Sequence, residues 1–103
     1  MAKVKVYNGS TFCAELIYRQ KGQDVQIINH ITEPLIHLPF GLRNRVSWDV
    51  FFSYMTSRCF PEERRNKKDL LKSLGLAEYD PFEIVKKTQG RMAEDNTWLE
   101  IEE

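Results

Sequence analysis

The residue types that most often carry catalysis or bind metals are few and widely spaced in this sequence. The two histidines, His30 and His37, lie seven residues apart, and neither belongs to the paired Cys or His motifs that hold zinc. Cys59 lacks the surrounding signature of a Cys–His nucleophile. We therefore expect no metal site, no cofactor and no nucleophilic centre.

Adjacent carboxylates are the remaining candidates for acid–base chemistry. They occur as Glu62–Glu63, Glu94–Asp95 and Glu102–Glu103. Neighbouring residues on a helix point in different directions, so such pairs do not build a general acid/base pair by themselves. The five glycines are scattered and form no phosphate-binding loop. The sequence predicts a protein that is not an enzyme on its own.

Charge is balanced in sum but polarised along the chain. Lys plus Arg and Asp plus Glu both number 15, so net charge does not favour nucleic acid or membranes. Residues 58–72 hold six basic and three acidic side chains, whereas residues 94–103 hold five acids and no base. The basic run is either a solvated helix face with ion pairs or a nucleic-acid contact. We favour the first, because no aromatic residues interleave to stack bases.

Length and composition indicate one folded domain over residues 1–103. Apolar residues make up 42% of the chain and aromatic residues 12%, which is ample for a core. No stretch approaches the roughly 20 apolar residues of a membrane span, and the first ten residues lack the apolar run of a signal peptide. We expect a cytoplasmic protein in which Cys13 and Cys59 are buried thiols.

The N-terminal part of the chain has the pattern of a β-meander. Val4 and Val6 alternate with lysines, and Asn8-Gly9 is a strong hairpin signal. Residues 11–19 and 25–31 follow as strands, with Phe12 expected on the same face as Leu16. Residues 33–41 contain two prolines and predict an extended edge segment, because proline cannot donate to a ladder.

The second half of the chain has helix signals. Ser47 is a plausible N-cap, Pro61 fits the first turn of a second helix that Gly75 ends, and Asp80 caps a third that Gly90 ends. The apolar face of the first helix is predicted to comprise Trp48, Phe51, Phe52 and Met55. Alternation around Trp98 predicts a closing strand. The fold class is α+β: a small antiparallel sheet, made of the meander plus a C-terminal strand, with about three helices packed on one face.

The order of these motifs resembles the N-terminal subdomain of the HipA-like serine/threonine kinases. The matching steps are Leu38-Pro39, Phe51-Phe52, Pro61-Glu62, Pro81-Phe82 with Ile84-Val85, and Gly90-Arg91. In that family the unit stands before a kinase body. A separate chain of this kind is similar to the small HipS-like subunit of split toxin–antitoxin systems.

The resemblance implies a non-catalytic regulatory or antitoxin subunit that binds and restrains a HipA-like kinase toxin, in systems that usually include a helix-turn-helix HipB-like protein. Two features depart from the family. The Pro-Glu step continues as Glu63-Arg64-Arg65 without the tryptophan of the split systems, and the "GRD" ending becomes "GRMAEDNTW". The family's inhibitory contact is therefore not carried over residue by residue.

Two segments are the expected partner-binding surfaces, residues 58–65 and residues 91–95. Arginine suits bidentate capture of carboxylate or phosphate, and Met92 has no obvious use at a surface without a partner. An ordinary surface loop is the alternative for residues 91–95. The candidate contact residues are Arg58, Phe60, Glu62, Arg64, Arg65, Arg91, Met92, Glu94 and Asp95.

A second class of function stays open from the sequence. The chain has the size and charge polarity of a small phage or mobile-element protein that inhibits a nucleic-acid enzyme, or that touches nucleic acid through the basic helix predicted at 61–72. Direct nucleic-acid binding is the less expected form, because the net charge is zero.

Overall fold

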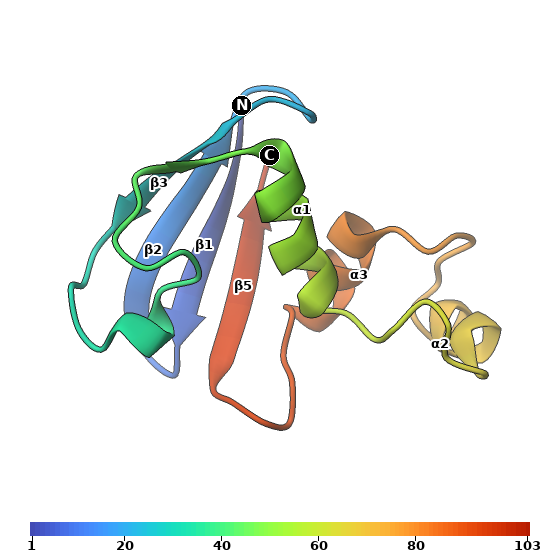
Figure 1. The fold of residues 1–103 in the computed structure, drawn as a ribbon. Coiled ribbons are helices and arrows are strands. Elements are labelled where there is room, and N and C mark those ends of the chain that lie inside the picture. Colours follow the sequence, from blue (N-terminus) through green and yellow to red (C-terminus); the bar gives the residue numbers. More distant parts are fainter.

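A computed structural model describes all 103 residues of the chain, and its centre is a five-stranded antiparallel sheet (Figure 1). The strands are β1 (Ala2–Asn8), β2 (Thr11–Tyr18), β3 (Val25–Asn29), β4 (Arg45–Val46) and β5 (Thr97–Glu102). They lie in the order β4-β3-β2-β1-β5, so the last strand returns to pair with the first. The predicted α+β fold, a meander completed by a C-terminal strand, is confirmed.

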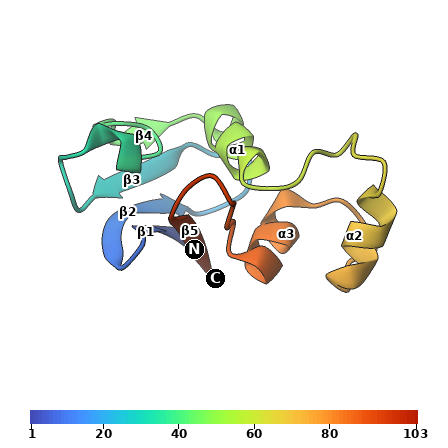
Figure 2. The same cartoon turned by 90° about the horizontal axis from the view of Figure 1, so that it is seen from below.

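Three helices join the meander to the last strand: α1 (Trp48–Ser57), α2 (Lys67–Ser73) and α3 (Pro81–Thr88). Helix α1 lies across one face of the sheet and α3 lies next to β5 (Figure 1). Figure 2 shows α2 beyond α3, at the end of the molecule farthest from β4. We call residues 59–79 the α2 end. None of these helices has the length and apolar character needed to cross a bilayer.

The core fills the space between the sheet and α1 and α3. Val4, Leu16, Phe51 and Met55 are fully buried, and each large apolar side chain buried in this way stabilises the fold by about 1.5–3 kcal/mol. Phe52 was predicted to face inward with them, but 39% of its surface is exposed. The inward face of α1 is therefore narrower than the sequence pattern suggests.

Capping side chains set the starts of α1 and α3 as predicted. The Ser47 hydroxyl accepts a hydrogen bond from the Val50 N–H at 3.3 Å, and the Asp80 carboxylate accepts one from the Phe82 N–H at 3.0 Å. Each cap satisfies a backbone donor that the helix itself leaves free.

The predicted start of the second helix at Pro61 is wrong, because α2 begins at Lys67. Residues 61–66 instead form consecutive turns, in which the Arg64 N–H donates to the Pro61 carbonyl and the Lys67 N–H to the Arg64 carbonyl. Between Pro61 and Leu70 the chain has no apolar side chain to pack against the body. A short helix is marginal without such packing, so proline and good helix formers alone do not suffice.

The predicted extended edge segment over residues 33–41 is also wrong. Leu35–His37 form a 3₁₀ helix, and the edge position belongs to β4, which pairs with Val25 and Gln26 of β3. The two prolines within residues 33–41 have no backbone N–H to donate to a neighbouring strand, whereas both residues of Arg45–Val46 have one.

A β-bulge explains a third difference, the orientation of Phe12. The register between β1 and β2 shifts between Val6 and Tyr7, so that Cys13 is the extra residue and both Cys13 and Ala14 are buried. The extra residue reverses the alternation of side chains. Phe12 therefore lies on the open face of the sheet beside Tyr7, and not on the face of Leu16.

Candidate partner-binding groove

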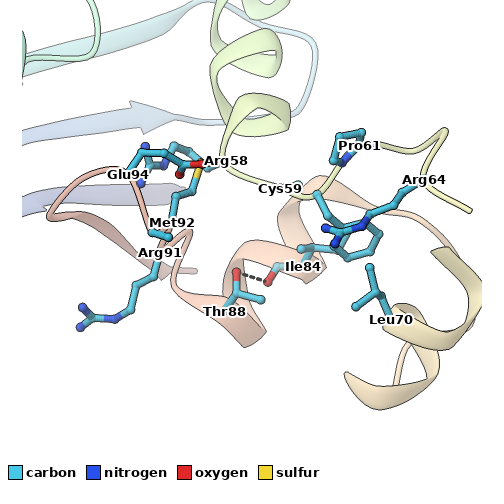
Figure 3. A pocket seen from close by; sticks show the side chains of 12 residues that line it. Arg58, Cys59, Pro61, Arg64, Leu70, Ile84, Thr88, Arg91, Met92 and Glu94 are labelled. Carbon is cyan, nitrogen blue, oxygen red and sulfur yellow. Dashed lines mark hydrogen bonds between the residues drawn. The ribbon is translucent and has the colours of Figure 1, made fainter. Parts of the chain in front are cut away.

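An open groove of about 530 Å³ lies where the segment after α1, helix α2, helix α3 and the loop before β5 meet. Its apolar lining includes Phe60, Pro61, Leu70 and Met92, whereas Ile84, which also borders it, is buried. Figure 3 shows Arg64 and Leu70 on one side of it and Arg91, Met92 and Glu94 on the other. The groove thus joins residues far apart in the sequence.

One wall of the groove is the segment that leaves α1. Cys59 is buried there, with its thiol within hydrogen-bond range of the carbonyls of Met55 and Pro81. The Tyr79 hydroxyl donates to the Phe60 carbonyl at 2.6 Å, and the two rings pack edge to face at 5.5 Å. These contacts tie residues 59–60 to the start of α3.

The opposite wall is the C-terminal end of α3. The helix ends with Gln89 and Gly90 both at positive φ, 59° and 62°. A Cβ atom on Gly90 would lie 3.2 Å from the Leu99 side chain and 3.3 Å from the Arg58 Cβ. Glycine therefore suits position 90 for two reasons: it adopts the positive φ without strain, and it leaves room for the side chains of Leu99 and Arg58. This turn directs residues 91–94 along the groove.

Arg58 and Asp95 hold the groove's loop to the end of α1. The guanidinium donates to both Asp95 carboxylate oxygens, at 2.8 and 3.0 Å, and also to the carbonyls of Gly90 and Thr97 at 2.9 and 3.0 Å. The Arg58 side chain is only 8% exposed, whereas that of Asp95 is 40% exposed. Hydrogen bonding from Arg58 lowers the pKa of Asp95, and the carboxylate in turn raises the pKa of Arg58.

The two predicted contact segments meet at this groove. The candidate residues that line it are Arg58, Phe60, Arg64, Arg91, Met92 and Glu94. Glu62 and Arg65 are exposed beside it, and Asp95 lies behind the loop with its carboxylate on Arg58. Arg58 and Asp95 satisfy each other within the chain, a role that the sequence does not indicate.

Arg64 and Arg91 are the cations that remain open at the rim. Both are exposed and neither makes an ion pair. Arg91 donates from Nε to the Gln89 side chain at 3.0 Å and lies over the Trp98 ring at 5.0 Å, which holds it in place without neutralising it. An anion at the rim would therefore find two arginines free to bind it.

The basic residues of the α2 end are likewise unpaired. They are Arg64, Arg65, Lys67, Lys68 and Lys72. All the salt bridges of the structure lie outside residues 59–79. The expected ion pairs of this basic run are therefore absent, and its charge faces solvent.

A row of stacked side chains on the open face of the sheet was missed by the sequence reasoning. Trp98 and Tyr7 stack at 4.2 Å, Tyr7 and Phe12 at 5.1 Å, and Phe12 and His30 at 4.4 Å, with Arg91 over the outer face of Trp98. The alternation of Tyr7 with Val4 and Val6 was the available signal. Because the ring faces cover one another, the row offers edges, and not stacking platforms, to a ligand.

Cys59, the candidate nucleophile, has two backbone carbonyls and no histidine as hydrogen-bond partners. Burial raises the pKa of the Cys59 thiol to about 11, which disfavours the reactive thiolate. His30 instead lies against Glu15, with 2.7 Å between Nε2 and a carboxylate oxygen. No three His, Cys, Asp or Glu side chains cluster in a way that could hold a metal ion.

Comparison with protein-family models, with curated proteins and with solved structures finds no significant match to this chain.

Proposed function

We propose that this protein is a non-catalytic regulatory subunit that docks on a HipA-like kinase in the cytoplasm and restrains it. The observation that carries the proposal is the groove: the two segments whose residue types predict partner contact lie along it. Its rim holds Arg64 and Arg91 without carboxylate partners. A surface with apolar side chains and uncompensated arginines is suited to binding a protein.

The proposal rests on the motif resemblance and on this geometry, since no relative was found. In the proposed docking, the Arg58–Asp95 pair is a positioning element, because it fixes the loop that presents Arg91 and Met92. The residues after Pro61 hold arginines where the split systems have a tryptophan. Restraint would then act through charged contacts at the rim, and a HipB-like protein is the expected further member of the complex.

The test is an affinity capture from the source organism with identification of bound proteins by mass spectrometry. Three baits are compared: the wild type, the groove variant R64E/R91E, and a control variant R19E/R43E, whose exposed arginines do not line the groove. Recovery of a HipA-like kinase by the wild type and the control, and its loss with the groove variant, supports the proposal. Recovery of other partners with no kinase would refute it.

The unpaired basic residues of the α2 end favour one second candidate, an inhibitor that acts on a nucleic-acid enzyme or on nucleic acid itself. A salt titration of binding to duplex DNA and to RNA tests its direct form. Phosphate contacts give a log–log slope of about 0.9 per phosphate neutralised on B-DNA. Absence of binding at low salt would exclude direct nucleic-acid contact.

A further inference from the structure

We propose that the groove recognises an acidic peptide segment that carries one bulky apolar side chain, with the apolar side chain in the groove and the flanking carboxylates on its rim. This inference rests on the docking role of the groove given above. It adds the chemistry of the bound segment, which neither the sequence motifs nor the resemblance supplies.

The apolar anchor follows from the groove's surface. Met92 and Phe60 are half-buried and both line the groove, so the exposed apolar parts of these two side chains face it from the loop before β5 and from the segment after α1. A volume of about 530 Å³ lies within the range of pockets that enclose small ligands. Removing part of a large aliphatic or aromatic side chain from water there favours binding.

The acidic character follows from which charges are already compensated. The Arg58 guanidinium, although it lines the groove, has its charge paired with Asp95 and donates four hydrogen bonds, two to that carboxylate and two to carbonyls. Arg64 and Arg91 remain without ion pairs, on opposite sides of the groove in Figure 3. Carboxylates on either side of an anchor would meet a guanidinium at each side, in the bidentate geometry that arginine provides.

A peptide accounts for the groove better than a nucleic acid does. Glu94 lies on the same rim and would repel a phosphate and a carboxylate alike, so it does not separate the two ligands. The Phe60 ring packs edge to face against Tyr79, and the rings on the open sheet face stack on one another, so neither group forms a row of free aromatic faces on which successive bases could stack. The combination of apolar surface, two arginines and one carboxylate is that of a mixed peptide site.

The experiment is panning of a phage-displayed random dodecapeptide library on the full-length wild-type protein, with parallel selections on R64E/R91E, on M92S and on the control R19E/R43E. We expect the wild type and the control to enrich peptides with Asp or Glu on both sides of Leu, Ile, Phe or Trp. R64E/R91E should lose the acidic preference, and M92S should weaken the best peptide at least about threefold in fluorescence anisotropy. Circular dichroism melts of each variant show that the fold is retained.

Three results would overturn the inference: enrichment of basic or uncharged peptides, equal enrichment on the wild type and R64E/R91E, or no enrichment. Tighter binding of a single-stranded oligonucleotide than of any peptide would also overturn the inference. It would favour the second candidate function, an inhibitor that acts on nucleic acid. Failure here is distinct from failure of the proposed function. If a kinase is captured equally well without Arg64 and Arg91, only the proposed peptide recognition by the groove is refuted. If acidic peptides are selected but no kinase is captured, only the proposal that the partner is a HipA-like kinase is refuted.

Discussion

The sheet and the α2 end handle their charges in opposite ways. On the sheet, Lys3 pairs with Glu15 at 2.9 Å and Lys5 with Glu102 at 2.6 Å, and Arg58 is enclosed by its partners. On the α2 end, five basic residues have no ion pair, and α2 itself begins late because little apolar surface supports it. Arg19, Arg43 and Arg45 of the sheet half are also without ion pairs, so the contrast lies in the α2 end, where no charged side chain is paired. The α2 end, we infer, is the part of the molecule shaped for contact with another protein.

Two arginines that both line the groove differ in the same way as the two regions. Arg58 and Arg64 lie six residues apart and both line the groove. Arg58 is buried and donates four hydrogen bonds, whereas Arg64 is exposed and makes no ion pair. Buried charge is tolerated only when it is paired and hydrogen-bonded, so Arg58 is tied to stability. Arg64 has no such constraint, which leaves it available for binding.

The largest expected effect on stability comes from removing the hydrogen bonds of Arg58. The substitution Arg58→Ala leaves the carbonyls of Gly90 and Thr97 and the Asp95 carboxylate without their donor. We expect the free energy of unfolding to fall by about 2–4 kcal/mol, measured by urea denaturation. Arg64→Ala is the matched control and should change it by less than about 0.5 kcal/mol. Similar losses in both variants would contradict the distinction between the two arginines.

The next effect concerns the stacked row on the open sheet face. Trp98→Ala removes the ring between Tyr7 and Arg91 and the hydrogen bond from the indole N–H to the Gly9 carbonyl at 2.9 Å. We expect a loss of about 2–3 kcal/mol in unfolding free energy, because stacking, burial and one hydrogen bond are lost together. A change below about 0.5 kcal/mol would mean that the row adds nothing to the sheet.

Acid should weaken the Arg58–Asp95 link in a defined direction. Folding lowers the pKa of Asp95 because Arg58 donates to the carboxylate, so its stabilisation is present above the unfolded pKa of about 4 and is lost as pH falls through the lower folded value. Asp95→Asn should therefore destabilise the protein at pH 7, and the difference from wild type should narrow below about pH 4. Thermal melts of both proteins across this range test the expectation. A difference that stays constant with pH would rule out the charge as its origin.

The smallest expected effect on stability comes from substitutions in the α2 end. Arg64→Ala with Arg65→Ala removes two exposed, unpaired side chains, so unfolding free energy should change by less than about 0.5 kcal/mol. Affinity for the captured kinase, measured by calorimetry, should nevertheless fall. Unchanged affinity would remove this loop from the interface.

Much of the fold could be predicted because its signals are local. Ser47 and Asp80 mark the starts of α1 and α3 by capping, and Asn8-Gly9 marks the hairpin between β1 and β2. These signals act within a few residues, where short-range hydrogen bonding and turn geometry decide the structure.

The remainder depends on contacts that no local pattern encodes. Arg58 and Asp95 are 37 residues apart, and only the return of β5 to β1 brings them together. The bulge at Cys13 moved Phe12 to the open face, and the lack of apolar support delayed α2 to Lys67. The candidate segments 58–65 and 91–95 were found by residue type, whereas the groove between them appears only in three dimensions.

The most direct test of the account is ¹H–¹⁵N chemical-shift mapping of the protein with an acidic, apolar-anchored peptide of sequence DEDLFDEDE at up to about 1 mM, a range that detects even weak complexes. Binding in the groove should produce shifts that concentrate at residues 59–64, around Leu70 and along residues 84–94, and the R64E/R91E variant should show none of them. Shifts centred on the stacked row of the sheet, or none at all, would contradict the claim that the groove at the α2 end is where this protein meets its partner.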